Sequence, residues 1–281
     1  MKIVIIYNAK RERSVEFTST LSKYLYDHGA EIMPCQDKPG FSIDDLEGVD
    51  FSSCDAGIVL GGDGTLLAAV RALSVFDIPL FGVNMGRVGF LSSTEADDAL
   101  AAVDKLLAGQ YIIRERLMIK SSLIRHGQEK SVYTAFNDFV VSSGEYSRAI
   151  TFDLSIDSQA IDSYNADGVI VSTPTGSTGY SLSAGGPILM DDMDITLITP
   201  ICPHTFFSRP IVASAGSEID IVFKSDSHTA FLTADGQFRV TLAKNDLVSI
   251  SAADKKAKII QFGPDDYFER IKKKIYRKGE N

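Results

Sequence analysis

The first hundred residues alternate short apolar runs with segments in which apolar residues recur at helical spacing. The apolar runs cover residues 2–7, 31–33, 56–60 and 78–83. The helical patterns cover residues 17–28, 66–73 and 95–107. Continuous apolar runs are typical of strands that are buried on both faces of a parallel sheet. Strands that alternate with helices predict an α/β domain with a Rossmann-like, doubly wound parallel sheet, which we place at residues 1–100.

After about residue 114 the pattern changes to short runs in which apolar and polar residues alternate. These runs cover residues 117–124, 132–141, 150–156, 168–172, 195–199, 219–223 and 247–251. Strands of this kind, separated by glycine, serine and asparagine, predict a mainly antiparallel β-sandwich. We place this β-rich domain at residues 101–263, with the change of pattern near residues 100–113.

Helical spacing returns in the tail, over residues 265–277. We expect a C-terminal helix at about 264–281 that returns to the first domain and packs on it. Lys272, Lys273 and Lys274 are interpreted as the solvated face and the cation-favouring end of this helix.

The composition is that of an ordinary globular protein, and it argues against several partners. The 281 residues are 44% hydrophobic and 23% charged, with a formal net charge of −9. An acidic chain lacks the basic face that nucleic acids and anionic membranes require. No apolar stretch reaches the roughly 18 residues of a membrane span, and Met1 leads directly into the first predicted strand without a signal pattern. We therefore expect a soluble, cytoplasmic protein with no nucleic-acid or membrane partner.

The cysteines and histidines do not indicate a metal or a disulfide framework. The three cysteines, Cys35, Cys54 and Cys202, have no Cys-x-x-Cys spacing, and the four histidines are scattered. This pattern supports neither paired disulfides nor a zinc site.

Residues 58–65 read Ile-Val-Leu-Gly-Gly-Asp-Gly-Thr, which predicts a strand, a tight turn and the start of a helix. The motif glycines Gly61, Gly62 and Gly64 would let the backbone take positive φ and approach a ligand closely, and N–H groups at a helix start favour a phosphate. Asp63 is the candidate chemical centre, because a carboxylate beside phosphates is repelled unless it binds a metal, accepts a hydroxyl proton or orients a hydroxyl. The alternative is an Asp-Gly turn in which Asp63 caps the helix.

A second polar feature, Phe-Asn-Asp-Phe at 136–139, lies inside an apolar run. Neighbouring residues of a regular strand point to opposite faces, so a bulge or a strand end would be needed for both side chains to serve one ligand. Asn137 would then give a donor and an acceptor to a base edge, and Asp138 would accept from ribose hydroxyls. A turn or strand-end pair without a ligand is the open alternative.

The stretch 167–187 begins as a strand and continues as a dense run of small residues and hydroxyls. Its backbone could approach a ligand closely, with Thr178, Ser181 and Ser183 bonding a sugar or phosphate and Tyr180 stacking on a ring. The alternative is a flexible Gly/Ser loop. A Walker A loop and the protein-kinase signature set are both absent from the sequence, which argues against those two phosphoryl-transfer families.

Together these motifs resemble the NAD kinase family over nearly the full chain. Gly-Gly-Asp-Gly-Thr at 61–65 is also similar to motifs of 6-phosphofructokinases and of diacylglycerol and sphingosine kinases. The residues that distinguish the NAD kinases are 82–91, 136–139 and, above all, the Thr-Pro-Thr-Gly-Ser-Thr-Gly-Tyr core at 173–180.

The resemblance implies an enzyme that transfers the terminal phosphoryl group of ATP to the 2′-hydroxyl of the adenosine ribose of NAD, with Asp63 as the proton acceptor. It implies nucleotide-binding residues at Asp63, Gly64, Asn137, Asp138, Arg148, Asn165, Asp167, Thr178, Gly179, Tyr180, Ser181, Leu182, Ser183 and Gln237. Position 165 is often basic in the family, and Asn165 departs from that pattern, so Arg148 is the candidate cation in its place.

The resemblance further implies a divalent cation, Mg²⁺, which would enter with ATP because the protein offers no metal cage, and a homodimer or homotetramer. Two other functions stay open at this point. One is a noncatalytic NAD(P)-binding regulator, which would bind without turnover. The other is a lipid or sugar kinase that shares the glycine turn and ignores NAD.

Overall fold

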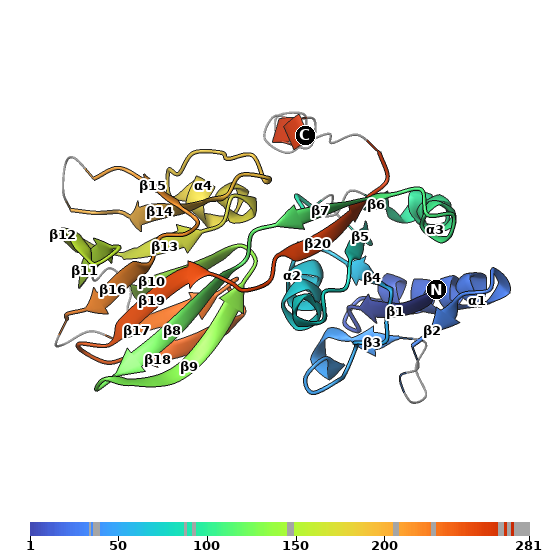
Figure 1. Ribbon diagram of the computed structural model, residues 1–281, viewed down its shortest axis with the longest axis horizontal. Helices are drawn as coiled ribbons and strands as arrows, with labels where there is room; N and C mark the ends of the chain where they lie inside the picture. The colour runs from blue at the N-terminus through green and yellow to red at the C-terminus, as the bar shows by residue number, and fades with distance from the viewer. Residues whose placement is uncertain are drawn as a thin grey trace. The chain divides into compact units, whose positions relative to one another are not determined.

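The structure is a computed structural model that describes residues 1–33, 35, 40–86, 89–91, 94–144, 149–204, 208–225, 229–263, 267–268 and 271–272. The chain divides into two compact units (Figure 1). The first unit comprises residues 1–115 and 257–281, and the second comprises residues 116–256. These limits differ from the expected ones, because the chain leaves the β-rich unit at residue 256 and its next strand joins the first unit.

Over its described residues up to 261, the first unit has one eight-stranded sheet and three α-helices. The strands are β1 (Lys2–Tyr7), β2 (Glu31–Ile32), β3 (Phe41–Ser42), β4 (Ala56–Gly61), β5 (Leu80–Asn84), β6 (Thr94–Glu95), β7 (Ile112–Arg116) and β20 (Ala257–Gln261). The helices are α1 (Glu12–Asp27), α2 (Asp63–Leu73) and α3 (Ala99–Leu107), with 3₁₀ turns η1 (Ile43–Asp45), η2 (Ser74–Phe76) and η3 (Ala96–Asp98). The main strand order is β2-β1-β4-β5-β20-β7, with β3 beside β1 and β6 beside β5.

The sheet is parallel at its centre and carries helices on both faces. Strand β1 pairs in parallel with β4, and β4 pairs in parallel with β5. On one face Ile5 shares a core with Leu25 of α1 and with α3. On the other face a Cβ on Gly57 would lie 3.3 Å from Val4 and 3.5 Å from Leu73 of α2. The predicted doubly wound α/β domain is therefore confirmed.

In its described residues the second unit has two six-stranded antiparallel sheets. The first sheet has the order β15 (Ile211–Ser214), β14 (Ile195–Ile201), β13 (Gly168–Ser172), β10 (Asp138–Ser143), β17 (Ala230–Ala234) and β18 (Phe238–Leu242). The second has the order β12 (Gln159–Ala166), β11 (Ile150–Ile156), β16 (Ile219–Phe223), β19 (Leu247–Ala252), β8 (Ile119–Arg125) and β9 (Gln128–Ala135). Between β13 and β14 lie the 3₁₀ turn η4 (Thr175–Thr178) and the short helix α4 (Tyr180–Ser183).

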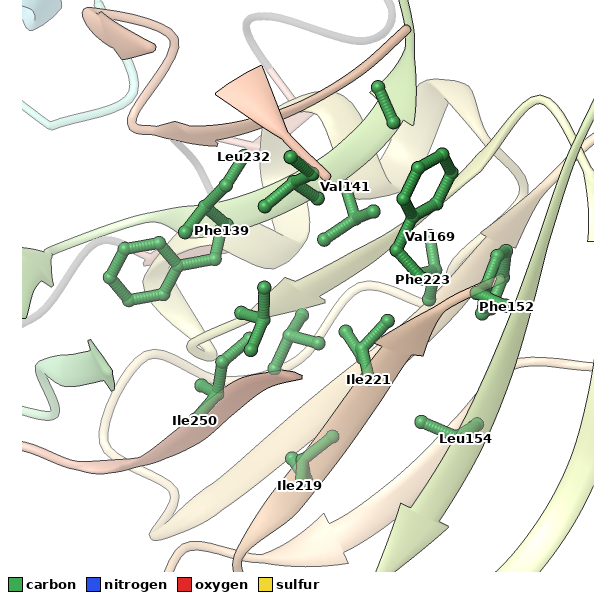
Figure 2. Close-up of a cluster of buried hydrophobic side chains, with 14 of the residues drawn as sticks. Phe139, Val141, Phe152, Leu154, Val169, Ile219, Ile221, Phe223, Leu232 and Ile250 are labelled. Carbon is green, nitrogen blue, oxygen red and sulfur yellow. The ribbon is translucent and has the colours of Figure 1, made fainter. Parts of the chain in front are cut away.

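The two sheets enclose a common apolar core, which Figure 2 shows. Phe139 and Val141 of β10 point inward from the first sheet, and Phe152, Ile221 and Ile250 point inward from the second. This alternation of inward and outward residues along each strand is the arrangement of a β-sandwich. The predicted sandwich is confirmed.

One predicted strand was wrong in its extent. The apolar run 132–141 is two strands, β9 and β10, that belong to different sheets and are separated at Phe136 and Asn137. The break arises because the backbone at 136–138 bonds to a distant side chain instead of continuing the pairing of β9. Short strands such as β20, and the exposed β12, carry little local signal and were not predicted.

Most of the predicted C-terminal helix lies outside the described residues. Tyr267 and Ile271 are helical and buried. No helix in the described part of the chain has the length and apolar character that a membrane crossing requires.

Candidate active site

The glycine turn of the first unit joins β4 to α2. Strand β4 ends at Gly61, Gly62 is the N-cap of α2, and Asp63 is the first helical residue. A Cβ on Gly61 would lie 2.3 Å from Thr65 Oγ1, so glycine is required there by side-chain packing. The expectation of positive φ was wrong, because none of the motif glycines has it. A Cβ on Gly62 would meet no atom within 4 Å, which leaves room for a ligand beside the helix start.

The Asp63 carboxylate reaches across to a neighbouring loop of the same unit. The backbone N–H of Phe90 donates to Oδ2 at 2.8 Å, and that of Leu91 donates to Oδ1 at 3.2 Å. A Cβ on Gly89 would lie only 1.8 Å from Oδ1, so the carboxylate occupies the space that any side chain at Gly89 would need. The N-cap residue of α2 is Gly62, so Asp63 does not occupy the cap position that the alternative reading gave it.

This arrangement gives a half-buried carboxylate with a defined orientation at the carboxyl end of a parallel strand. Open α/β sheets bind their ligands at that edge. Two N–H donors fix the carboxylate plane, and a carboxylate so held can accept a proton from a hydroxyl or orient it for attack.

In the second unit, Asn137 and Asp138 lie at a strand end. Asn137 directly precedes β10, and Asp138 is its first residue. An atom at the Cβ position of Gly179 would lie 3.8 Å from Asn137 Nδ2 and 4.0 Å from Asp138 Oδ2. The two neighbouring side chains therefore approach the same part of the η4–α4 segment, as the strand-end hypothesis requires.

The backbone of Asn137 is fixed by its neighbours, while its side-chain oxygen has no partner among the described residues. Its carbonyl accepts from the Thr173 N–H at 2.9 Å, and a Cβ on Gly176 would lie 2.1 Å from the same oxygen. Asn137 Oδ1 and Thr175 Oγ1 are buried without a hydrogen-bond partner among the described residues. Buried polar atoms are nearly always paired, so these two atoms indicate a place for a polar ligand.

The predicted run Thr178–Ser183 forms the end of η4 and the helix α4. Thr178 Oγ1 donates to the Thr175 carbonyl at 3.2 Å, and Tyr180 is exposed, as stacking on a ring would need. Ser181 is buried, and its hydroxyl bonds Thr199 Oγ1 at 2.8 Å. The Ser181 side chain therefore anchors α4 on β14. Leu182 is half-buried and Ser183 exposed.

The other predicted binding residues are more dispersed. Asn165 is exposed on β12, an edge strand of the second sheet, and Asp167 lies between β12 and β13. Gln237 is exposed in the hairpin that joins β17 to β18. Arg148 lies outside the described residues. The described contacts bring Asn137, Asp138 and Gly179 together.

Sequence reasoning missed the residues that hold Asn137 and Asp138. The Asp235 carboxylate accepts the N–H groups of Phe136, Asn137 and Asp138, and Thr173 Oγ1 donates to the Phe136 carbonyl at 2.6 Å. The Asp-Gly pair at 235–236 is a recognisable hairpin signal. The residues around Asp235 and Gly236 do not indicate which backbone N–H groups bond to the Asp235 carboxylate.

Asp138 has an unusual ionisation. It is buried on the first sheet, and burial, with a contribution from the neighbouring Asp235 carboxylate, raises its pKa to about 7. A carboxyl with such a pKa is neutral in mildly acidic solution and can donate a hydrogen bond.

The folding stability of Asp138→Asn should therefore depend on pH differently from that of the native chain. The pKa of Asp138 is higher in the folded than in the unfolded protein, so its contribution is fully present below about pH 4 and is lost as pH rises towards 7. The native chain loses this contribution as the pH rises from 5 to 8, and Asp138→Asn has none to lose. We therefore expect the free energy of unfolding of the variant, relative to that of the native chain, to rise by a few kcal/mol over this range, since each pKa unit corresponds to about 1.4 kcal/mol. Urea unfolding at several pH values measures this.

Asp153→Asn is the matched control for that experiment. A hydrogen bond from Ser163, and the ammonium of Lys224, lower the pKa of Asp153 below its ordinary 3.8. Its contribution changes only below that pH, so the difference from the native chain should be constant from pH 5 to 8. If the difference in free energy of unfolding between Asp138→Asn and the native chain were also constant from pH 5 to 8, the pKa of Asp138 would not be raised by folding.

Comparison with known proteins matches both units to one family. The family model described as "ATP-NAD kinase N-terminal domain" matches residues 3–111, and "ATP-NAD kinase C-terminal domain" matches residues 136–262. An NAD kinase of Clostridium botulinum is 38% identical over 279 residues, which cover 99% of this chain and 98% of the relative. An NAD kinase of Natranaerobius thermophilus is 34% identical over 277 residues, 96% of each chain.

Two solved structures share the fold. The yeast NADH kinase complexed with NADH has a TM-score of 0.85 at 22% identity, covering 100% of this chain and 89% of that chain. The NAD kinase from Archaeoglobus fulgidus in complex with ATP has a TM-score of 0.76 at 24% identity, with 96% and 97% covered.

The fold and the matched domains identify the class of protein: it is a phosphotransferase, and within that class a kinase that acts on a nucleotide. More particularly, the chain belongs to the ATP-NAD kinase family. The family, the fold and the kinase activity predicted from the motifs are confirmed.

Proposed function

We propose that this chain transfers the terminal phosphoryl group of ATP to the 2′-hydroxyl of the adenosine ribose of NAD and so forms NADP. Membership of the ATP-NAD kinase family supports this activity. The observation that carries the mechanism is the Asp63 carboxylate, which two backbone N–H groups hold at the start of α2. An oriented carboxylate beside an open helix N-terminus suits a reaction between a hydroxyl and a phosphate.

Asp63 is the proposed proton acceptor and orienting group for the 2′-hydroxyl. Phosphoryl transfer passes through a loose transition state, so positioning and charge neutralisation matter more than a strong base. One carboxylate oxygen would accept the hydroxyl proton as the oxygen bonds the γ-phosphorus, and ADP would leave with the electrons of the broken bond. The hydrogen bonds from Phe90 and Leu91 keep the carboxylate in one plane during this step.

Asn137, Asp138 and the η4–α4 segment are the proposed binding residues for the adenosine part of NAD. The unpaired Asn137 Oδ1 and Thr175 Oγ1 offer acceptors to an exocyclic amine or a hydroxyl. Gly64, Asn165, Asp167, Gln237 and the run Thr178–Ser183 remain proposed contacts, and Arg148 remains the proposed cation for a phosphate.

A magnesium ion is the proposed metal. Among the described residues no group of three or more His, Cys, Asp or Glu side chains is arranged to hold a metal ion. The donors present fit a cation that is bound chiefly by triphosphate oxygens and water, which Mg²⁺ accepts readily. Such an ion would neutralise charge on the phosphoryl group that is transferred.

The test is an enzymatic assay with paired donors and acceptors. Purified protein with ATP, MgCl₂ and NAD should form NADP, which a coupled NADP-dependent dehydrogenase detects. Replacing NAD by NADH, and ATP by polyphosphate, would define the substrate range. Binding of NAD without product would favour a noncatalytic regulator, and phosphorylation of a diacylglycerol, sphingosine or sugar with no NADP would favour a lipid or sugar kinase.

The remaining proposals concern assembly and location. We propose a homodimer or homotetramer in the cytoplasm, which size-exclusion chromatography with light scattering and cell fractionation would test. A monomer at micromolar concentration with full activity would exclude a required assembly.

A further inference from the structure

The hairpin between β17 and β18 places a buried carboxylate next to Asn137 and Asp138. Asp235 and Gly236 both have positive φ, 49° and 64°, as the central residues of a tight hairpin turn do. The turn closes with the Gln237 N–H donating to the Ala234 carbonyl at 2.9 Å. This turn alone explains an Asp-Gly pair, but it does not explain why Asp235 as a whole residue is only 8% exposed.

The buried carboxylate accepts three consecutive backbone N–H groups. Asp235 Oδ1 accepts from Asn137 at 2.7 Å and from Asp138 at 3.2 Å, and Oδ2 accepts from Phe136 at 3.1 Å. The Asp235 N–H in turn donates to the Asp138 carbonyl at 2.9 Å. Both oxygens are used, so the Asn137–Asp138 backbone cannot rotate without breaking charge-assisted hydrogen bonds.

The same backbone is held from the opposite side. The Asn137 carbonyl accepts from Thr173 and packs against Gly176, where a Cβ would lie 2.1 Å from it. The peptide is therefore fixed between the hairpin and the start of η4. The Asn137 side chain, whose Oδ1 has no hydrogen-bond partner among the described residues, is left for a ligand.

We propose that Asp235 is a positioning residue for dinucleotide binding, whose carboxylate fixes Asn137 and Asp138 through their backbone N–H groups. This inference rests on the proposed function, in which Asn137 and Asp138 bind the adenosine part of NAD. Asp235 touches no substrate in this proposal and acts through its two neighbours.

Asp235 also has an electrostatic effect on Asp138, which the groups around Asp138 make clear. Strand β13 presents Ser172 opposite it, and the η4–α4 segment presents Gly179, both uncharged. Burial is the larger cause of the raised pKa of Asp138, and the charge of the neighbouring Asp235 is the second cause. Removing that charge should lower the pKa of Asp138.

Asp235→Asn is the informative variant. Asparagine tolerates positive φ as well as aspartate does, so the hairpin turn is kept. The amide keeps one acceptor but places an NH₂ group against the remaining backbone donors, so at least one charge-assisted hydrogen bond is lost. We expect the KM and the calorimetric Kd for NAD to rise at least about tenfold, with kcat within about threefold.

Asp157→Asn is the matched control. Asp157 also has positive φ, 50°, in the β11–β12 hairpin of the same unit. Its Oδ1 accepts the Glu218 N–H at 2.9 Å, and it has no part in the proposed binding residues. Its KM for NAD should be that of the native chain, which separates a general effect of the turn from a specific effect of Asp235.

A carboxyl-carbon NMR titration gives the readout that a purely structural role would not move. In the ligand-free native chain Asp138 should titrate near pH 7. In Asp235→Asn the same resonance should titrate at lower pH, and in Asp157→Asn it should not shift. The pH at which kcat/KM for NAD changes should move in the same direction as the resonance.

The outcomes separate this proposal from the proposed function. The titration and the calorimetry need no turnover, so a chain that binds NAD without forming NADP would refute the kinase and leave the positioning role standing. An unchanged Kd for NAD, or an unchanged Asp138 titration in Asp235→Asn, would overturn the positioning role. Should Asp235→Asn fail to fold, Asp235→Gly, which also tolerates positive φ, repeats the test. If both variants failed to fold, the positioning role would also be overturned, because the Asp235 carboxylate would then be required for the stability of the whole β-sandwich.

Discussion

Asp63→Asn should lower kcat for NADP formation at least about 10²-fold, the scale of one acid–base contribution. The asparagine amide cannot take the proton of the 2′-hydroxyl. It also turns an NH₂ group towards either the Phe90 or the Leu91 N–H, so the side chain loses one of the two hydrogen bonds that orient it. Steady-state kinetics with NAD and ATP measure the effect, and calorimetry should show the Kd for NAD within a few-fold of the native value.

Asp98→Asn is the control for this substitution. Asp98 is also an aspartate at a helix start, that of α3, where it is exposed and its side chain caps nothing. Its kcat should equal that of the native chain. Activity of Asp63→Asn close to the native level, with the melting temperature unchanged, would exclude Asp63 as the proton acceptor.

Much of the fold could be predicted because its signals are local. The apolar runs at 2–7, 56–60 and 78–83 became β1, β4 and β5, since burial on both faces of a parallel sheet demands apolar residues at every position. The turn after β4 was recognisable in the same way, from three glycines around one carboxylate within four residues.

The partners of the site residues could not be predicted, because they are distant in the sequence. The amides that hold Asp63 belong to Phe90 and Leu91, 27 and 28 residues along the chain. The carboxylate that breaks the run 132–141 at Asn137 belongs to Asp235, 98 residues away. Contacts of this kind are fixed by the strand order of each sheet, which neither periodicity nor turn chemistry specifies.

Glycine at position 89 illustrates the same limit. Gly89 lies within residues 82–91, one of the stretches that carry the resemblance to the NAD kinases. In the structure a Cβ at Gly89 would lie 1.8 Å from Asp63 Oδ1 and 2.6 Å from its Cγ. The reason for glycine here is therefore the carboxylate of another element and not a turn conformation, and this reason can be tested directly.

Gly89→Ala should lower kcat by about 10²-fold while leaving the fold intact. The added methyl group occupies the place of the Asp63 carboxylate, and the short side chain can turn away at little cost in stability. Displacing a reacting group by about 1 Å is enough to cost about 10²-fold in rate. Gly263→Ala is the control, because its Cβ would meet nothing within 4 Å. If Gly89→Ala kept native kcat with a native melting temperature, the Asp63 carboxylate would not need the orientation seen here, and the proposed role of the Phe90 and Leu91 amides would fail with it.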